Sequence, residues 1–141
     1  MGEIREKFDL DALRAGTFFI ETDLNIYSRR LVGEPIPGSG IIVPKRHAKT
    51  VFELTRDEWL DTLDLLRRAK DSLAEEFQPD GYTIGWNVGF VAGQTVQQAH
   101  LHLIPRFDDE VKSGLGIRYW VREGNRRQSQ EERRDEASPR A

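Results

Sequence analysis

The sequence predicts a single domain in which helix and strand share one hydrophobic core, and three observations lead to this prediction. The chain has 141 residues, a length typical of one domain. Apolar residues recur at helical spacing after Thr55, which predicts a long helix. Between Tyr82 and Gly89, large side chains alternate with small ones, which is the period of a half-buried strand. Helical and extended periods therefore coexist in one short chain.

Short elements are expected before the long helix. Residues Phe8–Ala15 predict a short helix that ends at Gly16. Two segments rich in aromatic and β-branched residues flank a polar turn and predict a hairpin. These segments are Thr17–Ile20 and Leu24–Leu31. Glycine and proline crowd Gly33–Gly40, which predicts a loop, and Ile41–Val43 predicts a buried strand that ends at Pro44.

The long helix has the clearest start of any element. Thr55 and Glu58 are spaced as a capping box. Leu54 and Trp59 have the spacing of the accompanying hydrophobic staple. The apolar residues at helical spacing predict the face that packs on the core, and they are Trp59, Leu63, Leu66, Leu73 and Phe77. Turn residues at Gln78–Gly81 are expected to end the helix.

The last strand is expected over Gln98–Ile104, before Pro105. Alternate side chains of a strand share a face. One face is aliphatic and suits the core, with Ala99, Leu101 and Leu103. The other face carries Gln98, His100, His102 and Ile104, and so holds two of the three histidines of the chain. Buried imidazoles need polar partners, so this face is a candidate functional site.

The residues alone leave three interpretations of His100 and His102 open. They are structural residues with satisfied hydrogen bonds, metal ligands, or groups that take part in chemistry. A pair of histidines two residues apart on a strand is typical of cupin-like metal sites, which add a glutamate a few residues later. Leu103–Phe107 contains no glutamate, and no third ligand is evident nearby. The spacing therefore does not support a metal site.

Two longer motifs resemble those of the histidine triad (HIT) family. Residues 87–106 read NVGFVAGQTVQQAHLHLIPR and resemble the family signature, and Ile41–His47 resembles its other recurrent segment. The resemblance covers Thr17 to Arg106. It implies an α+β fold in which one long helix packs on a bent antiparallel sheet of about five strands. It also implies a homodimer that joins two sheets, with a HIT-like domain over residues 1–121.

The resemblance also implies roles for individual residues. The family pattern has three alternating histidines, of which the first is replaced here by Gln98. His100 matches the nucleophile, which attacks a nucleotide α-phosphate and forms a transient nucleotidyl-imidazole. His102 and Gln94 match groups that contact the phosphate oxygens and the region of the leaving oxygen. The positions that match nucleotide- or phosphate-binding residues, or residues that support them, are Asn87, Thr95, Val96, Gln98 and His47.

Elementary chemistry agrees with a histidine nucleophile. Free imidazole has a pKa of about 6.5, so much of it is neutral and nucleophilic at neutral pH. A hydrogen bond from one ring nitrogen to a backbone carbonyl would fix the tautomer. In the family that carbonyl belongs to the first triad position, so the resemblance implies that Gln98 supplies it. The Gln98 side chain itself cannot take a proton, which predicts reduced activity or a shifted substrate preference. The segment Tyr27–Leu31, where the family's ribose-binding aspartate or asparagine should fall, contains neither residue.

The expected function is hydrolysis or transfer at a nucleotide α-phosphate through an adduct on His100. Dinucleoside polyphosphates and nucleoside phosphoramidates are the expected substrates, and the partner is thus a nucleotide or nucleotidyl small molecule. No cofactor or metal is required, although Mg²⁺ can accompany a polyphosphate substrate. The alternative is a non-catalytic module that binds or senses nucleotides, which follows if Gln98 abolishes turnover.

Composition limits the remaining classes. The net charge of -3 argues against long nucleic acid as a partner, because such binding needs many cationic contacts. The absence of cysteine excludes disulfides, thiolate zinc sites and cysteine nucleophiles. No signal peptide and no apolar run long enough to span a bilayer are evident, so a cytoplasmic protein without a membrane segment is expected. Residues 122–141 are charged and almost devoid of apolar side chains, which predicts a disordered tail.

Overall fold

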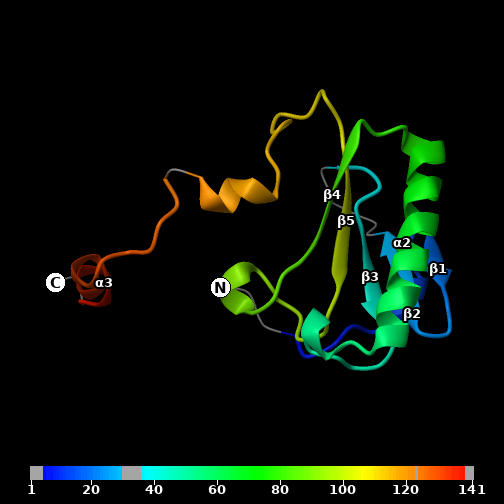
Figure 1. Cartoon of the computed structure of the whole chain (residues 1–141), viewed down its shortest axis with the longest axis horizontal. Helices are drawn as coiled ribbons and strands as arrows, with labels where there is room; N and C mark the ends of the chain where they lie inside the picture. The colour runs from blue at the N-terminus through cyan, green and yellow to red at the C-terminus, as the bar shows by residue number, and fades with distance from the viewer. Residues whose placement is uncertain (1–4, 30–35, 123, 139–141) are drawn as a thin grey trace.

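The computed structural model describes residues 5–29, 36–122 and 124–138, and its strands form one antiparallel sheet in the order β1-β2-β3-β5-β4 (Figure 1). The strands are β1 (Phe19–Glu21), β2 (Asn25–Arg29), β3 (Gly40–Pro44), β4 (Gly81–Trp86) and β5 (Leu101–Arg106). Strand β5 lies between β3 and β4, where His102 is opposite both Ile41 and Gly85. The predicted five-stranded α+β sheet is confirmed, and the strand that carries the histidine face is internal to it.

Helix α2 (Arg56–Phe77) covers one face of the sheet (Figure 1). It begins at Thr55, whose side chain accepts from the backbone of Glu58 while the Glu58 carboxylate accepts from the backbone of Thr55, so the predicted capping box is confirmed. The helix ends at Gln78, which adopts the left-handed conformation with φ 46°. The buried cluster between helix and sheet consists of Leu65, Ala69, Leu73, Tyr27, Ile42, Leu101 and Leu103.

The face of α2 that packs on the sheet differs from the predicted one. Trp59 and Leu63 are 46% and 43% exposed, so their predicted place in the core was wrong. The buried stripe instead holds two polar residues, Glu58 and Thr62, ahead of the apolar ones. Thr62 Oγ1 donates to the Glu58 carbonyl at 2.7 Å, and the Glu58 carboxylate accepts from the Arg46 guanidinium at 2.7 Å. These partners allow polar side chains to occupy positions that periodicity assigns to the surface.

The opposite face of the sheet is covered by the N-terminal part of the chain. Helix α1 (Leu10–Arg14) is capped by Asp9, close to the predicted range. Phe8 forms a buried cluster with Ile41, Val43 and Val96, and Leu13 packs against it. Because Ile41 and Ile42 are adjacent in β3 and belong to different clusters, the two clusters lie on opposite faces.

Strand β5 begins and ends later than predicted. Gln98–His100 form the approach to the strand, and Pro105 lies inside it, opposite Tyr82. The β3–β5 pairing extends only from Ile42–Leu101 to Gly40–Leu103. At Pro105 the strand therefore has a partner on one side only within the described residues. This edge-like position explains why a residue without a backbone N–H is tolerated there.

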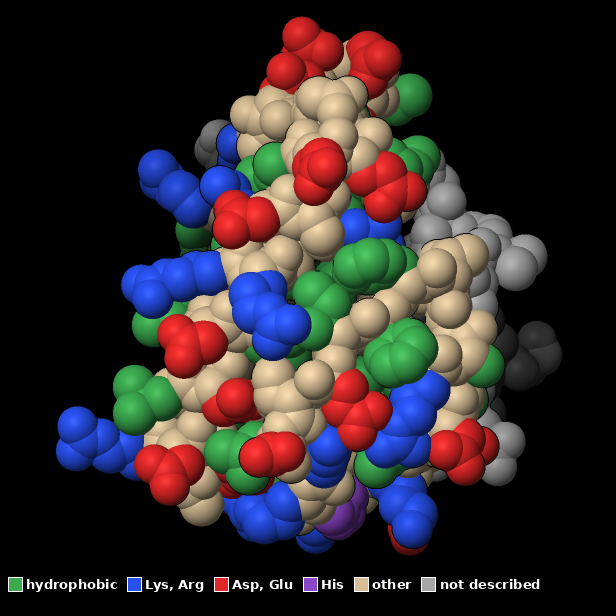
Figure 2. All heavy atoms as spheres, turned by 90° about the vertical axis from the view of Figure 1, so that its right-hand side faces the viewer, with side chains coloured by type: hydrophobic (Ala, Val, Ile, Leu, Met, Phe, Trp, Pro, Cys, Tyr) green, Lys and Arg blue, Asp and Glu red, His purple; other side chains and the backbone are tan. Residues whose placement is uncertain are grey.

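The chain after β5 extends away from the sheet (Figure 1). It includes the short 3-10 helix η3 (Ile117–Val121) and helix α3 (Gln130–Ala137). Helix α3 falls in the segment for which composition predicts disorder, and a capping box of Ser129 and Glu132 accounts for its start. Figure 2 shows basic and acidic side chains interspersed with small apolar areas over the face that carries α2. None of the helices within the described ranges has the length and apolar character needed to cross a membrane.

Candidate functional site

His100 and His102 lie together, as the strand alternation predicts. Their ring centroids are 4.8 Å apart at an interplanar angle of 64°. His102 belongs to β5 and its backbone is fixed by pairing on both sides, whereas His100 directly precedes the strand. His100 is only 8% exposed. The sheet thus presents two neighbouring imidazoles on the face opposite α2.

The orientation of the His100 ring is set by the backbone. Nδ1 of His100 lies 2.8 Å from the carbonyl oxygen of Gln98. A carbonyl can only accept a hydrogen bond, so Nδ1 carries the proton and, in the neutral ring, Nε2 keeps the lone pair. The predicted contact between this carbonyl and the ring is confirmed. In this tautomer Nε2 is the nitrogen that can act as a nucleophile toward an electrophilic phosphorus.

The N-terminal segment forms a wall of this site that no sequence pattern indicated. The Phe8 ring meets the His100 ring edge to face, with centroids 5.0 Å apart. Arg5 N donates to Thr95 O at 3.1 Å, and Gln97 N donates to Arg5 O at 2.7 Å. Residues 5–8 therefore lie along the segment that leads into the histidines. Phe8 is a single aromatic residue among charged neighbours, so no periodic pattern in the sequence predicts that it is buried beside His100.

Gln98, which the family resemblance matches to the first triad position, is 2% exposed. Its Oε1 accepts from Phe8 N at 2.8 Å, and its Nε2 donates to Pro44 O at 2.8 Å. Both ends of the amide are thus bonded to backbone groups, one in the N-terminal segment and one at the end of β3. The side chain of Gln98 holds these segments together, while its main-chain carbonyl contacts the His100 ring.

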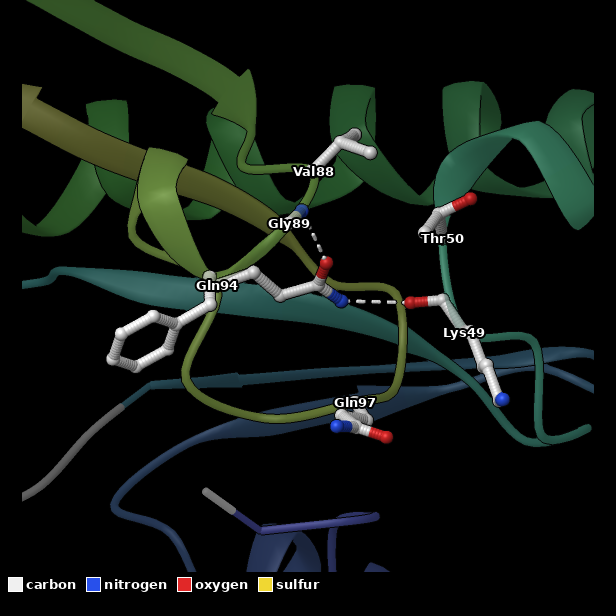
Figure 3. A pocket seen from close by; sticks show the side chains of 7 residues that line it. Lys49, Thr50, Val88, Gly89, Gln94 and Gln97 are labelled. Carbon is white, nitrogen blue, oxygen red and sulfur yellow. Dashed lines mark hydrogen bonds between the residues drawn. The ribbon is translucent and has the colours of Figure 1, made fainter. Parts of the chain in front are cut away.

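Gln94 closes the loop that precedes the histidines, as Figure 3 shows. Its Oε1 accepts from Gly89 N at 2.9 Å, and its Nε2 donates to Lys49 O at 2.7 Å and to Val96 O at 3.0 Å. Gly89 and Gly93 flank the 3-10 helix η2 (Phe90–Ala92) with φ values of 88° and 100°, which favour glycine. The Gln94 amide therefore holds the loop together with backbone hydrogen bonds from Ala92 and Gln94 to the Gly89 carbonyl.

The other predicted residues lie around this loop. The Asn87 amide nitrogen is 3.4 Å from the position that a Cβ on Gly93 would take, so this side chain lies against the loop. Val96 is buried beside Phe8, whereas Thr95 is exposed. His47 Nε2 lies 3.0 Å from Glu6 O and 2.9 Å from Gln97 O. Since both partners are carbonyls, this nitrogen donates, and His47 ties the N-terminal segment to the loop.

Two cavities border the segment from Gln94 to Gln98. One, of about 320 Å³, is lined by residues that include Lys49, Phe90, Gln94 and Gln97 (Figure 3). The other, of about 470 Å³, is lined by residues that include Lys7, Phe8, Lys45, His47 and Gln98. Both volumes lie in the range of small-molecule sites. Basic side chains line both, which suits an anionic ligand.

Ion pairs hold the edges of the site. The guanidinium of Arg14, then the ammonium of Lys45, lower the pKa of Glu21 to about 2. This carboxylate joins α1 to the end of β3, through contacts of 2.7 Å to Arg14 Nε and 2.6 Å to Lys45 Nζ. Arg106, on the same face of β5 as His102, donates to Thr83 Oγ1 at 3.0 Å and Leu115 O at 2.6 Å. Its guanidinium therefore holds the loop after β5 against β4.

The structure also bears on metal and ribose binding. Among the described residues, no three His, Asp or Glu side chains gather closely enough to hold a metal ion. In Tyr27–Leu31, Ser28 Oγ donates to Leu13 O at 2.7 Å, while Arg29 is buried and pairs with Glu76 of α2. Arg29 thus lies on the face away from the histidines. Residues 30 and 31 lie outside the described residues.

Comparison with known proteins decides the family. The HIT domain matches residues 21–109, which is more than half of the chain. This chain belongs to the HIT domain family. The HIT domain fold recurs in the crystal structure of a HIT family protein from Bacillus anthracis, at 29% identity and a TM-score of 0.60. The superposition covers 64% of this chain and 63% of that one.

Two curated relatives of this HIT domain carry enzyme names. The bis(5'-adenosyl)-triphosphatase of Dictyostelium discoideum is 36% identical over 101 residues, which cover 70% of this chain and 66% of the relative. The adenosine 5'-monophosphoramidase of Schizosaccharomyces pombe is 30% identical over 79 residues, or 56% of each chain. The match thus spans less than two thirds of the length of either relative.

Proposed function

We propose that this HIT domain is an enzyme that hydrolyses or transfers a nucleotide at its α-phosphate through a covalent adduct on His100. One observation carries the proposal, namely the 2.8 Å contact between His100 Nδ1 and the Gln98 carbonyl. It places the proton on Nδ1 and the lone pair of the neutral ring on Nε2. The relatives named as a triphosphatase and a phosphoramidase support the same substrate class.

In the proposed first step, the Nε2 lone pair of His100 forms a bond to the α-phosphorus. The bond from phosphorus to the leaving oxygen or nitrogen breaks, and the leaving group departs with that electron pair and takes a proton from solvent. The imidazole then carries a positive charge, which the Gln98 carbonyl stabilises through the Nδ1 proton. In the second step, water attacks phosphorus and releases a proton to solvent, the N–P bond breaks, and Nε2 regains its lone pair.

We assign the phosphate contacts to the groups around the loop. His102 lies 4.8 Å from His100 between ring centroids and would donate to the phosphate oxygens. Asn87, Thr95 and the backbone of Val96 would contact the phosphate and the leaving group. A second set of side chains would act by holding these donors in place, because each bonds to a backbone carbonyl of the site. This set consists of Gln94, Gln98 and His47.

The proposed substrates are dinucleoside polyphosphates and nucleoside phosphoramidates. His100 supplies the nucleophile, so the chemistry requires no cofactor, and Mg²⁺ would enter with a polyphosphate substrate as its counterion. The basic side chains of the two cavities, Lys49 in one and Lys7 and Lys45 in the other, match the charge of such a substrate.

We propose further that two copies pair, as the resemblance implies, and that they do so through β4. Strand β4 is an edge of the sheet that the described residues form, and an edge strand presents unpaired backbone groups. Ile84 is exposed on it, opposite Leu103 of the face that α2 covers. The Trp59 and Trp86 rings are 5.8 Å apart, which joins helix and strand into one apolar surface. An Ile84→Glu variant should sediment as a monomer where the native protein sediments as a dimer.

Product formation from diadenosine triphosphate, diadenosine tetraphosphate and adenosine phosphoramidate tests the enzymatic proposal. The native protein should turn over at least one of them, and a His100→Ala variant should lose that turnover. Acid cleaves the N–P bond of a phosphoimidazole, so the adduct should be trapped in alkaline denaturant and found by mass spectrometry on His100. Nucleotide binding without any product, equal in both proteins, would instead identify a binding module.

A further inference from the structure

Gln98 joins two distant parts of the backbone to the position beside the nucleophile. Its Oε1 accepts from Phe8 N across 90 residues of sequence, and its Nε2 donates to Pro44 O across 54 residues. Both bonds are 2.8 Å long and buried. A buried amide with a partner at each end has one favoured orientation, because rotation would leave polar groups unpaired.

The main chain of Gln98 contacts the nucleophile directly. Its carbonyl is the acceptor for His100 Nδ1 at 2.8 Å. Since the side chain is anchored at both ends, the backbone of Gln98 is held where this carbonyl meets the ring. The next residue, Ala99, adds a bond from its N–H to Ala48 O at 2.8 Å.

The same amide holds Phe8 against His100. Phe8 and His100 are both buried, and their ring centroids are 5.0 Å apart. Residues 5–8 also bond to the loop through Arg5, which pairs with Val96 in a parallel bridge. Gln98 is thus the point at which the N-terminal wall and the carbonyl that orients the ring are connected.

We propose that Gln98 is a positioning residue, which fixes the His100 ring and its Nδ1–H tautomer by clamping the N-terminal segment to the end of β3. Its kinetic consequence rests on the proposed function, whereas the clamp itself does not. In this proposal, Gln98 replaces the first triad histidine as the side chain that joins the two segments, and the orientation of His100 is preserved.

An amide performs this role over a wider pH range than an imidazole. Neutral imidazole offers one donor and one acceptor, but its protonated form offers two donors. A protonated ring at position 98 would then turn an N–H toward Phe8 N–H. The titratable and charged groups that surround the clamp are Lys7, Asp9, Lys45 and His47 in the cavity, Arg5 over the Phe8 ring, and His102 beside His100.

A Gln98→Met variant keeps the size of the side chain and removes both hydrogen bonds. Gln97→Met changes the same residue type at the adjacent, exposed position and is the matched control. In ¹⁵N NMR spectra of the substrate-free protein, His100 should be the Nδ1–H tautomer in the native and control proteins. In Gln98→Met the Nε2–H tautomer should appear, and the Phe8 amide should exchange with solvent at least about tenfold faster. An unchanged tautomer together with unchanged Phe8 exchange would overturn the clamp.

Changes in kcat and KM distinguish a role of Gln98 in positioning His100 from a role in overall stability alone. Gln98→Met should lower kcat at least about tenfold, because a misplaced nucleophile loses near-attack geometry, with a smaller change in KM. Gln98→His should recover kcat at pH 8 and lose it at pH 5 more steeply than the native protein. If Gln98→Met does not fold, Gln98→His at these two pH values carries the test through tautomer and exchange. If the native protein turns over no substrate, the proposed function fails. The NMR measurements of the His100 tautomer and of Phe8 amide exchange still test whether Gln98 positions the ring.

Discussion

The N-terminal and C-terminal segments of this chain are both rich in charge, but only the first is packed on the domain. Residues 5–14 and residues 122–138 are both rich in charge. The N-terminal segment is bonded to the loop before β5 and covers His100 through Phe8. The C-terminal arm, which we define as residues 122 and 124–138 and which contains helix α3, lies apart from the sheet (Figure 1). No residue of α3 is buried, whereas Phe8 is in a core cluster.

This difference shows that charge content does not decide whether a terminal segment belongs to a domain. The N-terminal segment is docked by the buried Phe8 ring, by backbone hydrogen bonds of Arg5, and by side-chain bonds from Gln98 and His47. The arm has its own capping box and the pair Arg126–Glu132, but these contacts are local to the arm. The capping box and this ion pair stabilise helix α3, but they do not connect it to the sheet.

Replacing the anchor should have the largest effect. Phe8→Ala removes a buried ring and should lower the free energy of unfolding by about 3 kcal/mol. The matched change near the other end is Trp120→Ala, where the ring is 68% exposed, and it should change stability by less than about 0.5 kcal/mol. Urea unfolding followed by circular dichroism measures both. Equal losses would show that Phe8 is no anchor.

Two serine substitutions sharpen the comparison at smaller scale. Ser28 Oγ donates to Leu13 O at 2.7 Å and so attaches α1 to β2. Ser138 Oγ donates to Arg134 O at 3.0 Å at the end of α3. Ser28→Ala should cost about 1 kcal/mol of global stability, as for one buried hydrogen bond. Ser138→Ala should leave the global transition unchanged, and a shift of that transition would attach the arm to the domain.

The pH dependence of stability should separate the two ends. Glu21 has its pKa lowered to about 2 by Arg14 and then Lys45, and Glu132 has its pKa lowered to about 2 by Arg126 and then the Ser129 backbone. A lowered carboxyl pKa adds stability above the unfolded value of about 4.3, and this is lost as pH falls toward the folded value. Glu21→Gln should therefore destabilise the protein at pH 7, and the gap from native should close between pH of about 4.3 and 2.

Glu132→Gln is the control for that titration. Its pair lies within the arm, so its protonation should not alter the global unfolding transition at any pH. Unfolding curves at pH 7, 4 and 2.5 compare the two variants with the native protein. A pH-dependent gap of equal size for both would contradict the separation of arm and domain.

Removal of residues 122–141 should have the smallest effect. We propose that the domain ends at residue 121, and the truncated protein should unfold within about 0.5 kcal/mol of the full chain, because none of the described residues that are lost is buried. Calorimetry measures this directly. A clear loss of stability would place part of the arm within the domain.

Elements that depend on neighbouring residues could be predicted from the sequence. The capping box of Thr55 and Glu58 and the shared face of His100 and His102 need only local spacing, and both are confirmed. The buried face of α2 could not be predicted in the same way. Its buried Glu58 is compensated by Arg46, which is 12 residues away in sequence, whereas hydrophobicity alone favours Trp59 and Leu63.

The histidines of the site could be predicted from the sequence, but the residues that pack around them could not. The contact between His100 and the Gln98 carbonyl was predicted from the family resemblance. The contacts of Phe8 with Gln98 and His100 join residues about 90 positions apart, and no local pattern indicates them. The same holds for Arg106, whose guanidinium bonds to the backbone of Lys112 and Leu115 because of a loop path that periodicity does not specify.

The 90-residue separation between Phe8 and Gln98 has a consequence for the order of folding. The β1–β2 hairpin and helix α2 form from local contacts, which lose little chain entropy on closure. The β3–β5 pairing comes later, because about 60 residues and the whole of α2 separate its partners. The N-terminal segment can dock only on the finished approach to β5. Phe8 is therefore expected to pack against His100 in the last steps of folding, and a nascent chain that has not yet emerged past His102 has no assembled histidine pair.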